Sequence, residues 1–389
     1  MRTVPRIILA AACSAAFFDL SIAGSPPQTQ YRVIILSAPT SLGNTIQDTA
    51  LVGGSYFLAS GAQHAALWAF GQQVDLGTLG NPSLSSAVLW PVKNYQGILS
   101  GISLTNKLDP NKEGWSCSYF IPNPNYNVCL GFVWDPRSGT MRALPTLGGT
   151  NGFATGSNDL GETVGWAETA VHDPSCVLPQ VLQFKPVLWG PGHDAVHALA
   201  LIDGDSSGAA TALNDRGQIV GISGACGIAV GGVSAKHAVI WDNGVPTEIV
   251  NPNGAPYWNT PMMINERGDV VGFVGAPNDP DGIYTPPFLW TRKGGFVFLP
   301  LLAGDIAGSA TSINDRGQIV GYSNDANGDL HPWIWQHGMT VNLNSLIEPG
   351  SGFTGTLALA FDINDEGVIT GQTSSQQAFI AVPVTPPAY

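Results

Sequence analysis

One eight-residue block recurs almost unchanged along the chain and constrains its fold more than any other feature. Asn-Asp-Arg-Gly-Gln-Ile-Val-Gly occupies positions 214–221 and again positions 314–321. Weaker copies begin at five further polar residues, Gln47, Asn94, Asn158, Asn265 and Asn364. The seven starts lie 47 to 64 residues apart, so we interpret the chain as seven copies of one supersecondary unit.

Each copy contains further apolar segments after this block. The first of them ends in tryptophan in six copies, at Trp68, Trp134, Trp189, Trp241, Trp290 and Trp335, and Ala381 replaces it in the seventh. A shorter apolar run follows before the next polar block. These segments alternate at period 2 and are separated by turn residues, which predicts four short β-strands in each repeat.

The turn chemistry supports an all-β fold. Asparagine and aspartate bond their own backbone in tight turns, and the glycine three residues later supplies a positive φ. The chain has 48 glycines and 29 prolines, too many for a helix-rich protein.

The two ends of the sequence predict how the repeats are arranged. The seventh repeat stops after 377–382 without a fourth strand, while an apolar segment at 31–36 precedes the first repeat. We expect that segment to complete the last sheet, because closing the ring removes exposed sheet edges. The prediction is a seven-bladed β-propeller of four-stranded antiparallel blades, forming one domain over residues 24–389. Six or eight blades, or an open solenoid, are the alternatives.

The repeats resemble the HAF repeat family of extracellular proteins. The similarity is greatest in His64-Ala65-Ala66-Leu67-Trp68, in Asp75-Leu76-Gly77-Thr78-Leu79-Gly80 and in His237-Ala238-Val239-Ile240-Trp241. It covers nearly all of the chain after the leader. The resemblance implies secretion and a repeat fold, and it supplies no catalytic residues. Gln47, Ala381 and long insertions in the second and third repeats depart from the pattern.

Residues 1–23 have the features of a secretory signal peptide. Arg2 and Arg6 precede an apolar run at 7–18, and Ser21-Ile22-Ala23 forms a cleavage pattern. We therefore expect a secreted or periplasmic protein. Lipoprotein anchoring at Cys13 and a buried first strand are the alternatives. No later segment reaches the roughly 20 apolar residues of a membrane-spanning helix.

Four cysteines remain after the leader: Cys117, Cys129, Cys176 and Cys226. An even number in an oxidising compartment predicts two disulfides, whose pairing the sequence leaves open. Cys117 and Cys129 share one insertion, where a bridge would close a short loop. Metal ligation is disfavoured because no pair has CxxC spacing.

The net charge of −13 makes nucleic acid and anionic lipid poor partners. We expect a monomer whose partner is a polysaccharide or a protein. All long insertions emerge on the same side of the predicted ring, opposite the near-identical Asn-Asp hairpins. They are 102–129, 167–184, 222–236 and 273–285, together with the link 251–261.

Variable loops on a rigid scaffold are where a binding site is expected. The candidate ligand-binding residues are the aromatic ones in or beside these loops: Trp115, Tyr119, Tyr126, Trp166, Tyr257, Trp258 and Tyr284. The alternative is that several of them only pack the loops against the ring. The repeated tryptophans are assigned to the core between blades.

Three acidic clusters have oxygen donors at alternate positions, as calcium requires. Their residues are Asp109, Asn111 and Glu113; Asp203 and Asp205; and Asp325, Asn327 and Asp329. Ordinary Asx turns are the favoured explanation of these clusters, and calcium binding is the alternative. No other cofactor is indicated.

Three functions remain open from the sequence. The first is a non-catalytic binding module for a polysaccharide or a surface protein, since the chain has no HExxH or phosphate-loop motif. The second is a glycan hydrolase or lyase whose acids converge over the central opening, from Asp109, Glu113, Glu168, Asp173, Asp279 and Asp281. The third is a structural envelope protein.

Overall fold

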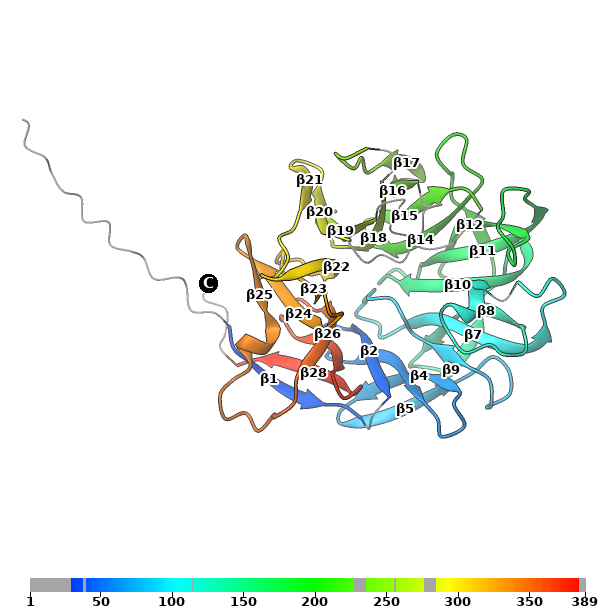
Figure 1. Cartoon of the computed structure of the whole chain (residues 1–389). Coiled ribbons are helices and arrows are strands. Elements are labelled where there is room, and N and C mark those ends of the chain that lie inside the picture. Colours follow the sequence, from blue (N-terminus) through cyan, green and yellow to red (C-terminus); the bar gives the residue numbers. More distant parts are fainter. Residues whose placement is uncertain are drawn as a thin grey trace, which may run out of the picture.

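The computed structural model describes residues 29–37, 40–113, 115–226, 236–254, 257–275 and 285–384, without the side chains of residues 115 and 116. Within this part of the chain, seven four-stranded antiparallel sheets are arranged as the blades of a β-propeller (Figure 1). The predicted fold class and number of blades are confirmed.

Each of the first six blades uses four strands that follow one another in the chain. Blade 1 is β2 (Ser41–Ile46), β3 (Val52–Phe57), β4 (Gln63–Ala69) and β5 (Gln72–Gly77), and blade 2 is β6 (Ser86–Ala87), β7 (Leu99–Leu108), β8 (Asn127–Asp135) and β9 (Thr140–Ala143). Blade 3 is β10 (Gly148–Ser157), β11 (Thr163–His172), β12 (Leu182–Trp189) and β13 (Val196–Ala198). Blade 4 is β14 (Ser207–Leu213), β15 (Ile219–Gly224), β16 (His237–Asp242) and β17 (Val245–Glu248).

The remaining blades keep this order until the ring closes. Blade 5 is β18 (Trp258–Ile264), β19 (Val270–Gly275), β20 (Pro287–Thr291) and β21 (Gly295–Phe298). Blade 6 is β22 (Asp305–Ile313), β23 (Ile319–Asp325), β24 (Leu330–Gln336) and β25 (Met339–Asn342). Blade 7 is β26 (Leu357–Ile363), β27 (Ile369–Thr373), β28 (Ala378–Pro383) and the N-terminal strand β1 (Tyr31–Ile35). Two short helices, α1 (Trp115–Ser118) and η1 (Leu343–Leu346), interrupt the strands.

The N-terminal strand completes blade 7, as the sequence predicts. Strand β1 pairs antiparallel with β28, from Tyr31 opposite Pro383 to Ile35 opposite Phe379. The two strands lie side by side in Figure 1, one in the blue and one in the red of the two chain ends. This pairing places both ends of the repeat array in a single sheet.

The repeated tryptophans pack between blades. Trp189 and Trp241 are almost fully buried, and their indole N–H groups donate to Pro145 O at 2.8 Å and Ala200 O at 2.6 Å in the preceding links. Trp290 and Trp335, whose side chains are half-buried, pack against the same core as Trp241. The conserved spacing of tryptophan therefore belongs to the scaffold.

The asparagine of the repeat both forms its turn and joins neighbouring blades. Asn214 Oδ1 accepts the N–H groups of Arg216 at 3.1 Å and Gln218 at 3.0 Å, which is the predicted Asx turn. Its Nδ2 donates to Asn265 O of the next blade at 3.0 Å. Asn158, Asn265, Asn314 and Asn364 make the same contact with the residue that follows them around the ring.

The acidic residue after that asparagine forms a second circle of contacts. Asp215 N donates to Glu266 Oε1, Glu266 N to Asp315 Oδ1, and Asp315 N to Asp365 Oδ1, each at 2.8 Å. The circle continues through Asp365 N to Asp48 at 2.9 Å. We call these two circles of contacts the hairpin ring. It explains why the repeat requires Asn-Asp and not simply any turn dipeptide.

The hairpin ring changes where the sequence departs from the repeat. Tyr95 replaces the acidic residue in blade 2, so blade 2 offers no carboxylate to blade 1. The neighbouring Lys93 instead reaches Asp362 of blade 7, with Nζ 3.1 Å from Oδ1. The Asp362 side chain is buried, and it also accepts from Ser312 of blade 6 at 2.5 Å and from Ile46 N of blade 1 at 2.7 Å. One carboxylate thus joins four blades near the irregular contact.

Candidate functional site

Insertions between the second and third strands decorate the face of the propeller opposite the hairpin ring. Those with described residues in blades 2, 3 and 4 span 109–126, 173–181 and 225–236, with residue 114 and residues 227–235 outside the described part. We call this side the insertion face. The insertions contain fewer residues than the sequence predicts, because β7, β8 and β11 extend into the segments expected to be loops.

Two disulfides fix these insertions. Cys117 and Cys129 are bonded within blade 2, and Cys176 of the blade 3 insertion is bonded to Cys226 of the blade 4 insertion. The second crosslink is reinforced by Val177 N, which donates to Cys226 O at 3.1 Å. The prediction of two disulfides is confirmed, and the pairing that the sequence left open is resolved.

A buried group of carboxylates joins the blade 2 insertion to blade 3. Glu113 Oε1 accepts from Val181 N at 2.8 Å and from Leu182 N at 2.5 Å. Asp109 Oδ2 accepts from Asn151 Nδ2 at 3.2 Å, and the same amide group donates to Glu168 Oε1 at 3.2 Å. The three acids are at most 5% exposed. Hydrogen bonds from backbone N–H groups and from the Asn151 amide therefore hold the blade 2 insertion against blade 3.

Glu168 is the most perturbed carboxyl group in this buried network. Burial, followed by the negative charge of Glu113, raises its pKa from 4.5 to about 7, against the hydrogen bonds from Asn151 and Gln180. The protonation of this group therefore changes within the physiological pH range.

The blade 2 insertion also extends toward the opposite side of the ring. Phe120 contacts Phe153 of blade 3 with ring centroids 4.9 Å apart, and Ile121 is buried. Tyr119 is close enough to Tyr322 of blade 6 to add to the increase in the pKa of Tyr322, which burial mainly causes. The insertion therefore packs on blade 3 and brings Tyr119 within electrostatic range of blade 6.

The insertions of blades 2 and 3, and the ends of strands β7 and β11 beside them, expose large apolar side chains to solvent. Leu108 is 66% exposed and lies beside Tyr126, which is 45% exposed. Val171, Val177 and Leu178 of blade 3 are 55%, 63% and 81% exposed. We call these five residues the apolar insertion residues. Sequence reasoning missed four of them because it considered only aromatic side chains.

The predicted aromatic residues do not form one surface. Tyr119, Tyr126 and Tyr257 are exposed, as a binding role requires. Trp166 and Trp258 are at most 2% exposed, which corrects the prediction that they contact a ligand. Trp166 packs against Phe184 and Trp258 against Phe273 within the blades. The side chain of Trp115 and all of Tyr284 lie outside the described part of the chain.

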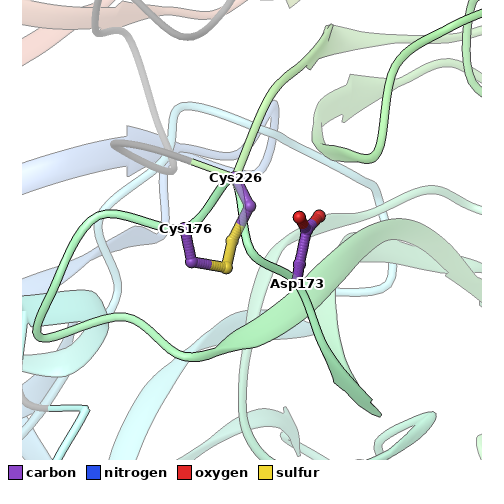
Figure 2. Close-up of side chains that lie close together, drawn as sticks. All are labelled: Asp173, Cys176 and Cys226. Atoms are coloured by element: carbon purple, nitrogen blue, oxygen red, sulfur yellow. A yellow bond between two sulfur atoms is a disulfide. The ribbon is translucent and has the colours of Figure 1, made fainter.

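Asp173 lies beside the disulfide that joins the insertions of blades 3 and 4. Figure 2 shows its carboxylate next to the bonded sulfur atoms of Cys176 and Cys226, and potential ligand atoms of the three residues lie within 4.8 Å of one another. A disulfide provides no thiolate, so these cysteines do not form a metal site in this state. Asp173 instead accepts hydrogen bonds from Ser175 N and Oγ at 2.8 and 2.7 Å.

The calcium candidates make ordinary hydrogen bonds within the protein. Asp325 Oδ1 accepts from Asn327 N at 2.8 Å and Asp329 N at 3.0 Å, which is an Asx turn. Asp205 Oδ2 accepts from Ser223 Oγ at 2.6 Å and lies 2.7 Å from His237 Nδ1, whereas Asp203 is exposed.

Asp109, Asn111 and Glu113 belong to the buried network described above. Among the described residues, no three acidic, histidine or cysteine side chains from these segments bring ligand atoms within 4.8 Å of one another. Calcium binding therefore stays a prediction.

The predicted catalytic acids do not converge over a central opening. Asp109, Glu113 and Glu168 do lie together, but they are buried beneath the blade 2 insertion, where a glycan cannot reach them. Asp173 is placed beside the disulfide instead. Asp279 and Asp281 lie outside the described residues. The geometry proposed for glycosidic cleavage is therefore wrong for the acids that the structure describes.

The hairpin ring surrounds a shallow acidic depression of about 70 Å³ on the other face. Asp159, Asp215, Glu266 and Asp315 are among its lining residues, together with Lys93. Burial is the main cause that raises the pKa of Asp159, Glu266 and Asp315, and neighbouring carboxylates add to it. Because these acids also accept backbone N–H groups between blades, their observed role is structural.

Comparisons with known proteins identify the fold and nothing more specific. No family model and no curated protein matches the chain. Virginiamycin B lyase from Staphylococcus aureus superimposes with a TM-score of 0.54 at 8% identity, over 92% of this chain and 100% of that one.

Two peptidases are similar over about half of their length. A prolyl endopeptidase has a TM-score of 0.52 at 11% identity, over 92% of this chain and 51% of that chain. A puromycin-hydrolysing peptidase from Mycobacterium tuberculosis has a TM-score of 0.52 at 10% identity, over 89% and 52%. This chain thus spans about half the length of either peptidase, and at these identities the likeness concerns the fold alone.

No helix within the described residues is long and apolar enough to cross a membrane. The two short helices have four residues each.

Proposed function

We propose that the protein is a secreted binding module that recognises a protein partner through the insertions of blades 2, 3 and 4. The observation that carries this proposal is the pairing of exposed apolar side chains with crosslinked loops. Large aliphatic groups on a monomer surface mark interaction sites when they gather on one region. Fixing such loops in advance reduces the entropy lost on binding.

The contacts between the insertions supply this rigidity. Glu113 holds the blade 3 insertion against the blade 2 insertion through two backbone N–H groups. The Cys176–Cys226 disulfide then holds the blade 3 insertion against that of blade 4. Loops that only connect strands of their own blade need neither the Glu113 hydrogen bonds nor the Cys176–Cys226 disulfide. These contacts join the insertions of blades 2, 3 and 4 into one rigid platform.

The chemistry of the exposed side chains favours a protein over a polysaccharide. Leu108, Val171, Val177 and Leu178 offer no hydrogen-bonding groups, whereas a sugar ring requires polar partners as well as flat aromatic surfaces. Two of the tryptophans that could have stacked on a sugar are buried. Apolar side chains of this kind suit the fully buried centre of a protein interface, which is more apolar than the rest of the surface.

Secretion and membership of the HAF repeat family belong to the same proposal. Residues 1–23 supply a leader sequence, and two disulfides suit an oxidising compartment. Two features carry the resemblance. The Asn-Asp turns form the hairpin ring, and the strands that end in tryptophan contribute to the core between blades.

The test compares two exposed apolar residues on opposite faces. Leu178→Ser changes the insertion face, and Phe70→Ser, at a residue 96% exposed in the turn between β4 and β5, is the matched control. Fluorescently labelled mature protein is titrated onto the surface and culture-fluid proteins of the producing cells, with protease-treated and glycosidase-treated samples alongside. Binding abolished by protease and reduced at least tenfold by Leu178→Ser alone is expected.

Two other results would overturn the proposal. Binding lost after glycosidase treatment but kept after protease treatment would identify a polysaccharide ligand. Equal binding by both variants and the unchanged protein would remove the insertion face from recognition.

A further inference from the structure

A cleft of about 490 Å³ lies between blades 2 and 3 on the side of the hairpins, away from the proposed partner site. Blade 2 contributes the hairpin that joins β8 to β9, and blade 3 contributes residues 190–195, which join β12 to β13. This second connection is six residues long, whereas the corresponding turns at 70–71, 243–244 and 337–338 have two. The cleft therefore exists where blade 3 departs from the repeat.

The corresponding contact between blades 4 and 5 is bridged by an ion pair. Asp242 follows the repeated tryptophan of blade 4, and Arg292 from the blade 5 hairpin approaches it to 2.7 Å. Asp135 occupies the same position in blade 2, but the blade 3 hairpin has no arginine to meet it. Asp135 instead pairs at 2.7 Å with Arg137 of its own hairpin. No ion pair between the described residues spans the two walls at Asp135.

Arg142 is the basic group of the cleft that reaches the opposite wall. Its side chain is 48% exposed, and Nη2 donates to Gly192 O at 2.5 Å, which fixes the guanidinium against that wall. Its ion pair with Asp194 is long, with Nη1 3.7 Å from Oδ1, and the Asp194 side chain is 92% exposed, so a bound carboxylate could replace this solvated partner. A guanidinium has five N–H donors in a planar fork that matches a carboxylate.

The rest of the lining suits a small polar molecule with an apolar side. Ile98 and Val133 are buried apolar residues of the cleft, and Ser138 and Thr140 place hydroxyl groups at its edge. His193 faces Thr163 Oγ1 at 3.0 Å. Burial, followed by the positive charge of Arg142, lowers the pKa of His193, so the arginines supply the positive charge at neutral pH.

We propose that this cleft binds the carboxylate of a sugar-sized organic anion, such as a uronic acid, with Arg142 as the anchor. Its volume lies within the usual range for small-ligand sites. The surrounding protein has a net charge of −13, so an anion is attracted only where arginines are concentrated. The site is independent of the protein partner on the opposite face.

The test is isothermal titration calorimetry with D-glucuronate, with D-glucose and with inorganic sulfate. Saturable binding of glucuronate is expected, with at least tenfold weaker binding of glucose and of sulfate. Arg142→Gln should weaken glucuronate binding at least tenfold. Arg292→Gln is the matched control, because Arg292 is an exposed arginine at the corresponding contact between blades 4 and 5 and already has its carboxylate partner. It should change the affinity less than twofold.

Unchanged melting temperatures of both arginine variants would show that folding is intact. Thr140→Val is a second variant, which removes a hydroxyl group from the cleft and leaves all charges in place. The proposal is overturned if glucuronate gives no saturable signal, if sulfate binds as tightly as glucuronate, or if the two arginine variants lose affinity equally. None of these results depends on binding at the insertion face.

Discussion

The hairpin ring and the insertion face use the same blades for different purposes. At the ring, each blade repeats one contact with the next, in which an asparagine amide meets a backbone carbonyl and a carboxylate meets a backbone N–H group. At the insertion face, the contacts do not repeat from blade to blade: one disulfide joins the insertions of blades 3 and 4, and Glu113 of blade 2 binds the backbone of blade 3. The repeated contacts close the ring of blades. The insertions, which differ from blade to blade, provide a surface that can recognise one partner.

Blades 2 and 3 show this difference most clearly. They carry the first two long insertions, the buried carboxylates and the cleft beside Arg142, and blade 2 also departs from the hairpin ring at Tyr95. Lys93 and Asp362 compensate for the departure by joining blades across the ring. Deviations from a repeat therefore indicate both where a site lies and where the scaffold needs an additional contact.

The largest effect is expected from the disulfide between the insertions. Replacing Cys176 and Cys226 by alanine should lower the free energy of unfolding by about 4 kcal/mol, because the bond closes a loop of 50 residues. The Cys117–Cys129 pair, which closes only 12 residues, should cost about 3 kcal/mol. Urea denaturation of both double variants measures the difference. A smaller loss from the long loop than from the short one would contradict this order.

The next effect tests the compensating contact at the hairpin ring. Asp362→Asn should destabilise the protein by about 3 kcal/mol, because it leaves the Lys93 ammonium without its charged partner in a mostly buried position. Asp365→Asn is the control at a less buried position of the same blade. Thermal and urea unfolding should show the loss for Asp362 only. Equal stability of the two variants would mean that the contact across the ring does not support closure.

An effect of similar size is expected from pH at the insertion face. Since the pKa of Glu168 is raised from 4.5 to about 7 on folding, the folded state binds a proton more tightly than the unfolded state. Its stabilising contribution is complete below about pH 4.5 and is lost as the pH rises to about 7.

Glu168→Gln should remove this part of the pH dependence, about 3 kcal/mol between the two limits. Unfolding measured from pH 4 to pH 8 for both proteins checks it. The idea fails if the two proteins have parallel pH profiles, or if the stability of the unchanged protein rises across this interval.

The architecture was predictable because the repeat is a local pattern with a long-range consequence. The spacing of asparagine, glycine and tryptophan gave seven blades, and the surplus strand at 31–36 predicted the pairing of β1 with β28. The sequence also indicated the Asx turn at Asn214. It could not show that the same asparagine also binds the next blade. An asparagine needed only for the turn and one needed for both contacts look identical in the sequence.

The site was less predictable because burial within insertions depends on tertiary packing. Trp166 and Trp258 belong to strands, where alternation decides which side chains point inward, and both are buried. The sequence could not show that Asp109, Glu113 and Glu168 lie together, and their burial prevents the catalytic role considered for them. Leu178 and Val177 gave no signal in the sequence, since isolated aliphatic residues in a loop are common on protein surfaces.

A crossed comparison of two variants tests most directly whether scaffold and recognition are separate. Asn314→Ala removes the contact with Asn364 O and the turn at the ring, and Leu178→Ser changes one exposed side chain of the platform. Melting temperature and binding to the producing cells are measured for each. Asn314→Ala should lose about 1 kcal/mol of stability with unchanged binding, while Leu178→Ser should lose binding at an unchanged melting temperature. If Asn314→Ala abolished binding while folded, or Leu178→Ser lowered the melting temperature and left binding intact, the division between the two faces would be contradicted.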